Sequence, residues 1–155
     1  MLKEQVIQVK DDLGEMPSGI YIKYISTVFE EGQELSEARL EELIREIRNE
    51  EGMGVILGQD PDMEENHMYI DIDQGLICFQ YIQNIGTVDE CFYSSFNPAY
   101  LDSEEESPIN CSDGQSIILM RYTMQNPELA AKCVEYFART GKLYPGMDWL
   151  KCEWD

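Results

Sequence analysis

The chain has 155 residues, the length of one domain, and its 43% hydrophobic and 10% aromatic content is too high for a disordered protein. It has 31 acidic and 11 basic residues, which give a formal net charge of -20. This charge argues against direct binding to nucleic acid or to an anionic membrane, because both carry the same sign, and it favours a cationic partner. With His67 as the only histidine, a site that needs several imidazoles is excluded.

The cysteines predict buried thiols and no zinc site. They stand at positions 78, 91, 111, 133 and 152, and none forms a C-x-x-C pair. The N-terminus shows no apolar signal segment, and the longest aliphatic run, Ile117–Met120, is far shorter than the ~20 residues that span a bilayer. We therefore expect a reduced, cytoplasmic protein with no bound metal and no cofactor.

The first third of the chain predicts two strands and a helix. Val6–Val9 alternates weakly, and Ile20–Phe29 is rich in β-branched and aromatic residues, so both are expected to be strands. Ser36–Glu50 is the clearest helix, with Ser36 as N-cap. Its apolar residues recur with helical spacing, at Leu40, Leu43, Ile44 and Ile47.

The middle of the chain predicts a sheet. Gly54–Gly58 is a short apolar strand, and His67–Asp73 alternates between apolar and polar residues. Gln74-Gly75 is typical of a hairpin turn, after which Leu76–Ile82 forms the returning strand. A further strand is expected over Glu90–Phe96.

The last third predicts a long loop, a strand and a second helix. Asn97–Gly114 has no periodicity, and loops of this length in a domain are usually functional or disordered. Ser116–Tyr122 is expected to be a strand. The second helix opens with Asn126 as N-cap and proline at the first helical position, and it ends at Gly141. The turn-rich tail Leu143–Trp149 follows.

This order of elements predicts an α+β fold: a mainly antiparallel sheet with two principal helices packed on it. The sequence contains no internal repeat and no linker-like segment. We therefore expect a single domain that spans residues 1–155.

The segment from Asp60 to Asp71 resembles a calcium-binding loop, because it opens with Asp60, Asp62 and Glu64. Its spacing fails. The sixth position requires glycine for a sharp turn but holds Glu65, and the twelfth is Asp71 instead of a bidentate glutamate. The segment is better explained as a solvated acidic loop.

Catalytic patterns are weak. Cys78, Cys91 or Cys111 with His67 would supply a nucleophile and a base, but no local signature supports the pairing. The sequence contains neither a P-loop nor a G-x-G-x-x-G motif. A small Cys/His enzyme stays an alternative, whereas the expected class is a protein without catalysis.

The C-terminal third carries a resemblance to a known family. After the helix that starts at Asn126, Phe137 precedes a Thr140-Gly141 stop, and Pro145 and Trp149 follow. This ending resembles the family numbered first among the immunity proteins of bacterial polymorphic toxin systems. The glycine-turn hairpin His67–Ile82 is similar to that family's sheet. Together these segments cover about half of the chain.

The resemblance implies a small α+β protein that binds a bacterial toxin and blocks it without doing chemistry. Toxins associated with this family are often nucleic-acid deaminases or nucleases. The four residues that match the family's ending are expected to be structural: Phe137, Gly141, Pro145 and Trp149.

Charge and loop character predict where such a toxin binds. Carboxylates would face a basic groove, and two apolar residues of the long loop would act as anchors. The candidate contact residues are Asp60, Asp62, Glu64, Glu65, Tyr100, Leu101, Asp102, Glu104, Glu105 and Glu106. A second interpretation of the charge is an acidic mimic of nucleic acid that inhibits many basic proteins.

Overall fold

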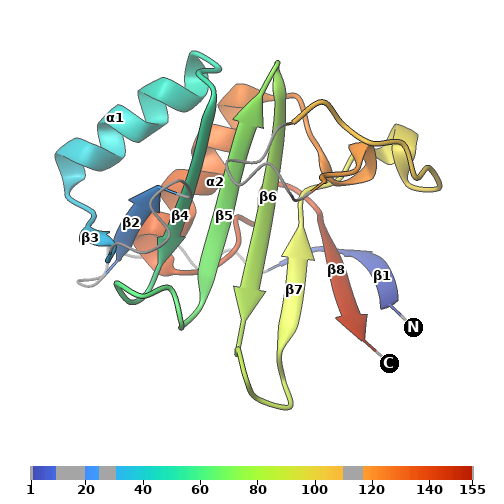
Figure 1. Cartoon of the computed structure of the whole chain (residues 1–155), viewed down its shortest axis with the longest axis horizontal. Helices are drawn as coiled ribbons and strands as arrows, with labels where there is room; N and C mark the ends of the chain where they lie inside the picture. Colours follow the sequence, from blue (N-terminus) through green and yellow to red (C-terminus); the bar gives the residue numbers. More distant parts are fainter. Residues whose placement is uncertain (1, 10–19, 25–30, 110–116, 155) are drawn as a thin grey trace.

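In the part of the chain that the structure describes, eight antiparallel strands form one sheet in the order β1-β8-β7-β6-β5-β4-β2-β3 (Figure 1). The computed structural model describes residues 2–9, 20–24, 31–109 and 117–154. The strands are β1 (Leu2–Ile7), β2 (Tyr21–Tyr24), β3 (Gln33–Glu34), β4 (Met53–Gly58), β5 (His67–Asp73), β6 (Leu76–Gln83), β7 (Cys91–Ser94) and β8 (Trp149–Trp154). Strands from both ends of the chain lie side by side, because β1 pairs with β8.

The hairpin of β5 and β6 forms the centre of the sheet. Asp73 and Leu76 are its last pair, and the two residues between them have positive φ angles, 52° at Gln74 and 78° at Gly75. Positive φ at both positions is the conformation of a tight two-residue hairpin turn, which glycine adopts without steric cost. The predicted hairpin is confirmed.

Two helices, α1 (Glu37–Arg48) and α2 (Pro127–Thr140), form at the predicted places. The Ser36 hydroxyl accepts a hydrogen bond from the Arg39 backbone N–H at 3.1 Å, and the Asn126 side chain accepts one from Leu129 N–H at 3.1 Å. Helix α2 ends at Gly141, whose φ of 71° is left-handed and whose N–H donates to the Phe137 carbonyl at 2.7 Å.

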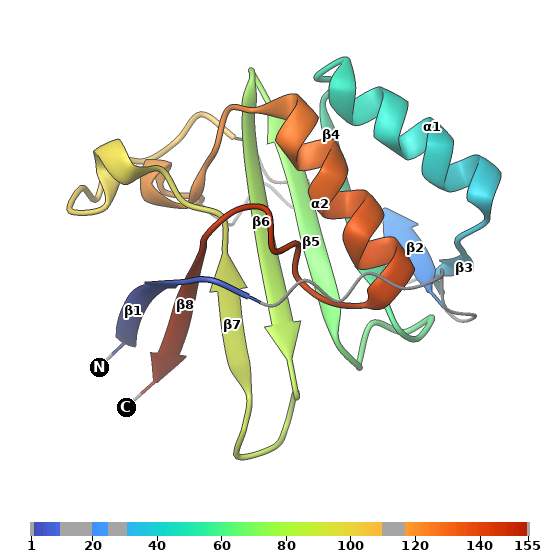
Figure 2. The ribbon, with the colours of Figure 1, turned by 180° about the vertical axis from the view of Figure 1, so that it is seen from behind.

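Both helices pack on the same face of the sheet (Figure 2), and the predicted α+β class is confirmed. One face of the sheet supplies the core, since neighbours in register such as Val55, Ile70 and Phe79 lie on the same side. Phe137 of α2 contacts this layer through an edge-on contact with the Tyr81 ring, at 5.6 Å between centroids. The core is therefore one continuous layer between the sheet and the helices.

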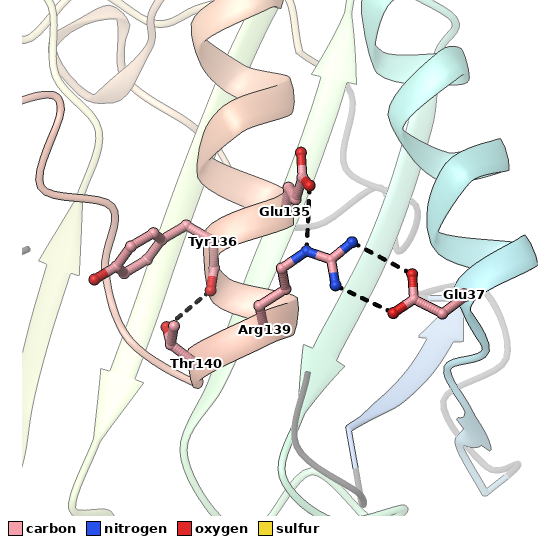
Figure 3. Close-up of polar contacts among 5 residues, drawn as sticks. All are labelled: Glu37, Glu135, Tyr136, Arg139 and Thr140. Atoms are coloured by element: carbon pink, nitrogen blue, oxygen red, sulfur yellow. Dashed lines mark hydrogen bonds and ion pairs between the residues drawn. The ribbon is translucent and has the colours of Figure 1, made fainter. Parts of the chain in front are cut away.

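An arginine clamp joins the two helices (Figure 3). The Arg139 guanidinium of α2 donates to both carboxylate oxygens of Glu37 at the start of α1, at 3.1 and 3.3 Å. It also donates to Glu135 at 3.2 Å. These hydrogen bonds, first to Glu37 and then to Glu135, raise the pKa of Arg139. A second bridge joins Arg48 of α1 to Glu128 of α2 at 3.0 Å, so two arginines link the helices within this layer.

Four sequence predictions differ from the structure. The strand predicted over Val6–Val9 is β1, which covers Leu2–Ile7. The strand predicted over Ile20–Phe29 is described only as β2, because residues 25–30 lie outside the described residues. The strand predicted over Ser116–Tyr122 is wrong: Leu119 makes one isolated bridge, to Glu106, and a 3-10 helix covers Met120–Tyr122. The tail predicted as turns ends in β8, whose neighbours β1 and β7 come from distant parts of the chain.

The long loop is ordered over residues 97–109. A 3-10 helix at Pro98–Tyr100 is capped by Asn97, whose side chain accepts from Ala99 N–H at 3.1 Å. Farther along, Ser107 N–H donates to the Ile118 carbonyl at 2.8 Å, and Met120 N–H donates to the Glu105 carbonyl at 2.8 Å. Backbone pairing therefore fixes this part of the loop against residues 118–120.

Burial of Cys133 predicts a loss of stability at alkaline pH. Burial raises the pKa of this thiol from 9.0 to about 12. Because the native state holds the thiol neutral, its contribution is full below pH 9.0 and is lost as the pH rises toward about 12. We expect the free energy of unfolding in urea to fall by about 2 kcal/mol more between about pH 8 and about pH 10.5 in the wild type than in Cys133→Ala. An equal fall in both proteins would contradict this assignment.

Candidate functional site

Among the described residues, other elements cover only part of the face of the sheet opposite the helices (Figure 1). A small apolar cluster covers the end of the face near the start of β6, where Leu76 and Cys78 contact Ile109 and Ile118. The rest of the face carries the side chains that alternate with the core residues along each strand and point away from the helices. Tyr69 of β5 and Gln80 of β6, which pair with each other, are two of them. This uncovered part is the candidate site.

The uncovered part contains a concavity of about 310 Å³. This volume is at the low end of the roughly 300–1,000 Å³ typical of ligand pockets, so it fits one large side chain better than a cofactor. Aromatic rings and small side chains from four strands and from the 3-10 helix line it. The residues whose side chains share this face are Tyr69, Gln80, Ile82, Phe92, Ser94, Tyr122 and Cys152. We call this concavity the aromatic pocket.

Hydrogen bonds hold Tyr122 at the rim of the aromatic pocket. The Ser95 hydroxyl accepts from Phe79 N–H at 2.9 Å and donates to the Tyr122 carbonyl at 2.7 Å. The Tyr122 hydroxyl donates to Glu4 of β1 at 2.6 Å, and the other oxygen of the same carboxylate accepts from Arg121 at 2.7 Å. One carboxylate of the edge strand therefore fixes two consecutive side chains of the 3-10 helix.

Three ionisable groups of the aromatic pocket are held in their neutral forms. Burial raises the pKa of Tyr69, and the nearby Asp71 carboxylate raises it further. Burial raises the pKa of Tyr122, and the hydrogen bond to Glu4 raises it further. The pKa of Cys152 rises to about 11, first because of burial and then because of Glu4, although Arg121 acts in the opposite direction. Burial is therefore the largest cause of all three shifts, and the Glu4 and Asp71 carboxylates add to it.

The first acidic segment divides into a structural residue and exposed ones. The Asp60 carboxylate accepts backbone N–H bonds from Asp62, Glu64 and Glu65, at 3.2, 2.9 and 2.8 Å. Asp60 is half-buried and stabilises the loop between β4 and β5, as aspartate commonly does in turns. The other three carboxylates are exposed.

The second acidic segment follows the 3-10 helix at Pro98–Tyr100. Tyr100 and Leu101, the predicted apolar anchors, are half-buried. Backbone bonds close the turn, since Ser103 N–H donates to the Tyr100 carbonyl at 2.9 Å. The acidic side chains after this turn are exposed: Asp102, Glu104, Glu105 and Glu106.

The structure does not bring the two acidic segments together. The first lies between the end of β4 and the start of β5, and the second follows the end of β7. The strands are antiparallel, so these loops lie at opposite ends of the sheet (Figure 1). The ten predicted contact residues therefore form two surfaces.

Cys78 and Cys91 do not approach His67 in the way that a nucleophile and base require. His67 pairs with Ile82, whereas Cys78 pairs with Asp71, four residues along β5 and therefore ~13 Å away. Cys91 pairs with Gln83, the residue after Ile82, so Cys91 and His67 lie on opposite faces of the sheet. Cys111 lies outside the described residues.

The residues that match the family's ending lie away from the aromatic pocket's surface. Phe137 and Trp149 are fully buried, and Gly141 terminates α2. The Trp149 indole N–H donates to the Tyr144 carbonyl at 2.8 Å, which closes the tail around the half-buried Pro145. Phe137 and Trp149 therefore pack in the core, and Gly141 reverses the direction of the chain.

Comparison with known proteins gives no assignment: no family model, no curated protein and no solved structure matches this chain. Within residues 2–9, 20–24, 31–109 and 117–154, no group of three or more histidine, cysteine or acidic side chains is arranged to hold a metal ion. In the same part of the chain, no helix has the length and apolar character needed to cross a bilayer.

The aromatic pocket was missed in the sequence because it combines residues from distant segments. One feature of the sequence does indicate it: the strand Leu76–Ile82 has apolar residues on both sides. Leu76, Cys78 and Ile82 lie on one side, and core residues lie on the other. A strand that is apolar on both sides contacts something on both faces. The parts played by Tyr122 and Cys152 depend on tertiary contacts, which no local pattern encodes.

Proposed function

We propose that this chain is an immunity protein that binds a cognate bacterial toxin and neutralises it by non-covalent occlusion. The C-terminal resemblance supports this function, and the toxin class that it implies is a nuclease or a nucleic-acid deaminase. Such enzymes bind a polyanion and present a basic surface to it. In this proposal the protein works in the cytoplasm, and its binding site takes neither nucleic acid nor membrane.

The observation that carries the proposal is the distribution of charge. In the described part of the chain, arginines of the helical layer are paired with glutamates of the same layer, at Arg39, Arg48 and Arg139. None of the ion pairs there includes a carboxylate of the 60–65 or 102–106 segments. Carboxylates that are outside the ion pairs of the described residues favour a basic protein partner and speed its association.

The test is an affinity titration against the toxin domain encoded immediately upstream of this chain's gene, at two salt concentrations. We expect nanomolar binding that weakens at high salt, because salt screens attraction between exposed charges. Nanomolar binding that is indifferent to salt would contradict the acidic interface and retain the immunity function. Absence of binding, or of such a gene, would overturn the immunity function.

A panel of unrelated basic proteins separates this proposal from the acidic mimic of nucleic acid. An immunity protein prefers one partner by several kcal/mol, because its interface is shaped for that partner. A mimic binds many basic proteins with similar affinity. Comparable affinities across the panel would favour the mimic.

A further inference from the structure

We infer that two loops at one end of the sheet form the surface that contacts the toxin, with Val88 as an apolar anchor inside an acidic rim. The loops are residues 59–66, between β4 and β5, and residues 84–90, between β6 and β7. We call them the paired loops. The inference rests on the proposed function and deepens it, because it names the contact surface and the chemistry of the partner: a basic surface with an apolar pocket.

The paired loops lie at the same end of the sheet (Figure 1). A hydrogen bond joins them, because the Asn84 backbone N–H donates to Asn66 Oδ1 at 2.9 Å. The four strands that they connect are consecutive neighbours in the sheet. The two loops therefore form one surface.

Val88 is an unusually exposed apolar residue. It is fully exposed, whereas the other exposed large apolar side chains of the described residues keep part of their surface covered: Val6 is 45%, Tyr24 48% and Ile117 64% exposed. Insertion of this side chain into a partner's pocket would remove its apolar surface from water, which favours binding.

Hydrogen bonds hold the chain on both sides of Val88. The Thr87 hydroxyl donates to the Asn84 carbonyl at 2.8 Å and accepts from the Asp89 N–H at 3.1 Å. The Glu90 N–H donates to the Thr87 carbonyl at 3.2 Å. Because the loop is ordered before binding, docking costs it little conformational entropy.

The charge around Val88 favours a basic partner. No lysine or arginine occurs between Arg48 and Arg121, so the paired loops and the strands that they connect contribute no cation. The exposed carboxylates of the loops are those of Asp62, Glu64, Glu65, Asp89 and Glu90. None of them takes part in an ion pair of the described residues. An acidic rim is complementary to a basic surface, whereas it repels a second copy of this chain, whose net charge is -20.

The other acidic segment lacks such an anchor. Its apolar residues Tyr100 and Leu101 are half-buried, and the described residues 97–109 include no exposed large apolar side chain. The 102–106 segment therefore adds long-range attraction, while the paired loops supply the close contact.

Substitutions of Val88 test the anchor by calorimetric titration against the upstream-encoded toxin domain, and thermal unfolding verifies that each variant folds. We expect Val88→Ala to weaken binding about 10-fold, because two methyl groups leave the interface. Val88→Asp should weaken it about 100-fold, because it places a carboxylate in an apolar pocket. Val6→Ala, an exposed valine on the edge strand β1, is the matched control and should change affinity about threefold or less. Wild-type affinity in Val88→Ala, or tighter binding by Val88→Asp, would overturn the anchor.

A double charge reversal tests the rim. Asp62→Lys combined with Asp89→Lys changes one exposed residue on each loop, and we expect binding to weaken about 30- to 100-fold because like charges then meet at the interface. Glu50→Lys combined with Glu51→Lys makes the same change in net charge just before β4, at the opposite end of that strand, and should cost about threefold or less. Equal losses in the two double variants, or no loss in the loop variant, would overturn docking at the paired loops.

The two proposals fail in different ways. If the wild-type protein does not bind the toxin domain, the immunity function fails and the inference fails with it. If the wild type binds with nanomolar affinity and both Val88→Ala and the loop double variant bind equally well, the immunity function stands and only the contact surface is overturned.

Discussion

Trp149→Ala is expected to lower the free energy of unfolding by about 4 kcal/mol, the usual cost of removing a large buried aromatic side chain. Trp149 is fully buried and starts β8, and its ring lies 6.2 Å from that of Phe79 between centroids. Its loss opens a cavity and leaves the Tyr144 carbonyl without the indole N–H, which now donates to it at 2.8 Å. Urea unfolding followed by circular dichroism measures the change.

Two further substitutions make this result interpretable. Trp149→Phe keeps most of the buried ring but removes the N–H donor, so we expect a loss of about 2 kcal/mol. Val88→Ala is the surface control: Val88 is fully exposed, and its substitution should change stability by about 0.5 kcal/mol or less. If Trp149→Ala costs no more than the Val88 control, the tail is not anchored by this side chain.

Reversing the charge of three consecutive glutamates is expected to slow toxin association about 10- to 100-fold. The substitutions are Glu104→Lys, Glu105→Lys and Glu106→Lys, all exposed and beyond the 3-10 helix of the second acidic segment. The attraction that steers a basic protein toward this end of the sheet is then replaced by repulsion. Stopped-flow measurement should also show a weaker dependence of the association rate on salt.

A variant with the same change in net charge separates a local effect from a global one. Glu41→Lys, Glu50→Lys and Glu51→Lys alter exposed residues on and just after α1, in the helical layer. We expect this triple variant to slow association by about threefold or less, because its charges lie across the sheet from the open face. Equal slowing in both triple variants would contradict steering by the loop, and so would unchanged rates in the loop variant.

Much of the fold follows from local patterns. The Gln74-Gly75 turn requires two residues with positive φ and lies between alternating segments, so its hairpin was predictable. The helix ends were predictable because Ser36, Asn126 and Gly141 perform capping that depends on a few neighbouring residues. Here local chemistry and the final structure agree.

Two segments that local patterns did not predict correctly depend on contacts with distant parts of the chain. β8 forms because β1 and β7 supply hydrogen-bonding partners from far along the chain. Ser116–Tyr122 was a reasonable strand by composition, but there Ile118 packs into a small cluster and residues 120–122 turn as a 3-10 helix. Strand formation is more dependent on such context than helix formation is.

The net charge, the acidic loops and the core-facing side of each central strand can be read from the amino-acid sequence, because composition and period-two alternation are local properties. The positions of those loops depend on how the strands pair. The antiparallel order of strands places the 60–65 and 102–106 segments at opposite ends of the sheet, whereas the sequence predicted that both would face one basic groove. It also brings Tyr69, Phe92, Tyr122 and Cys152 together in one pocket. Such positions are fixed by long-range strand pairing, which sequence periodicity does not encode.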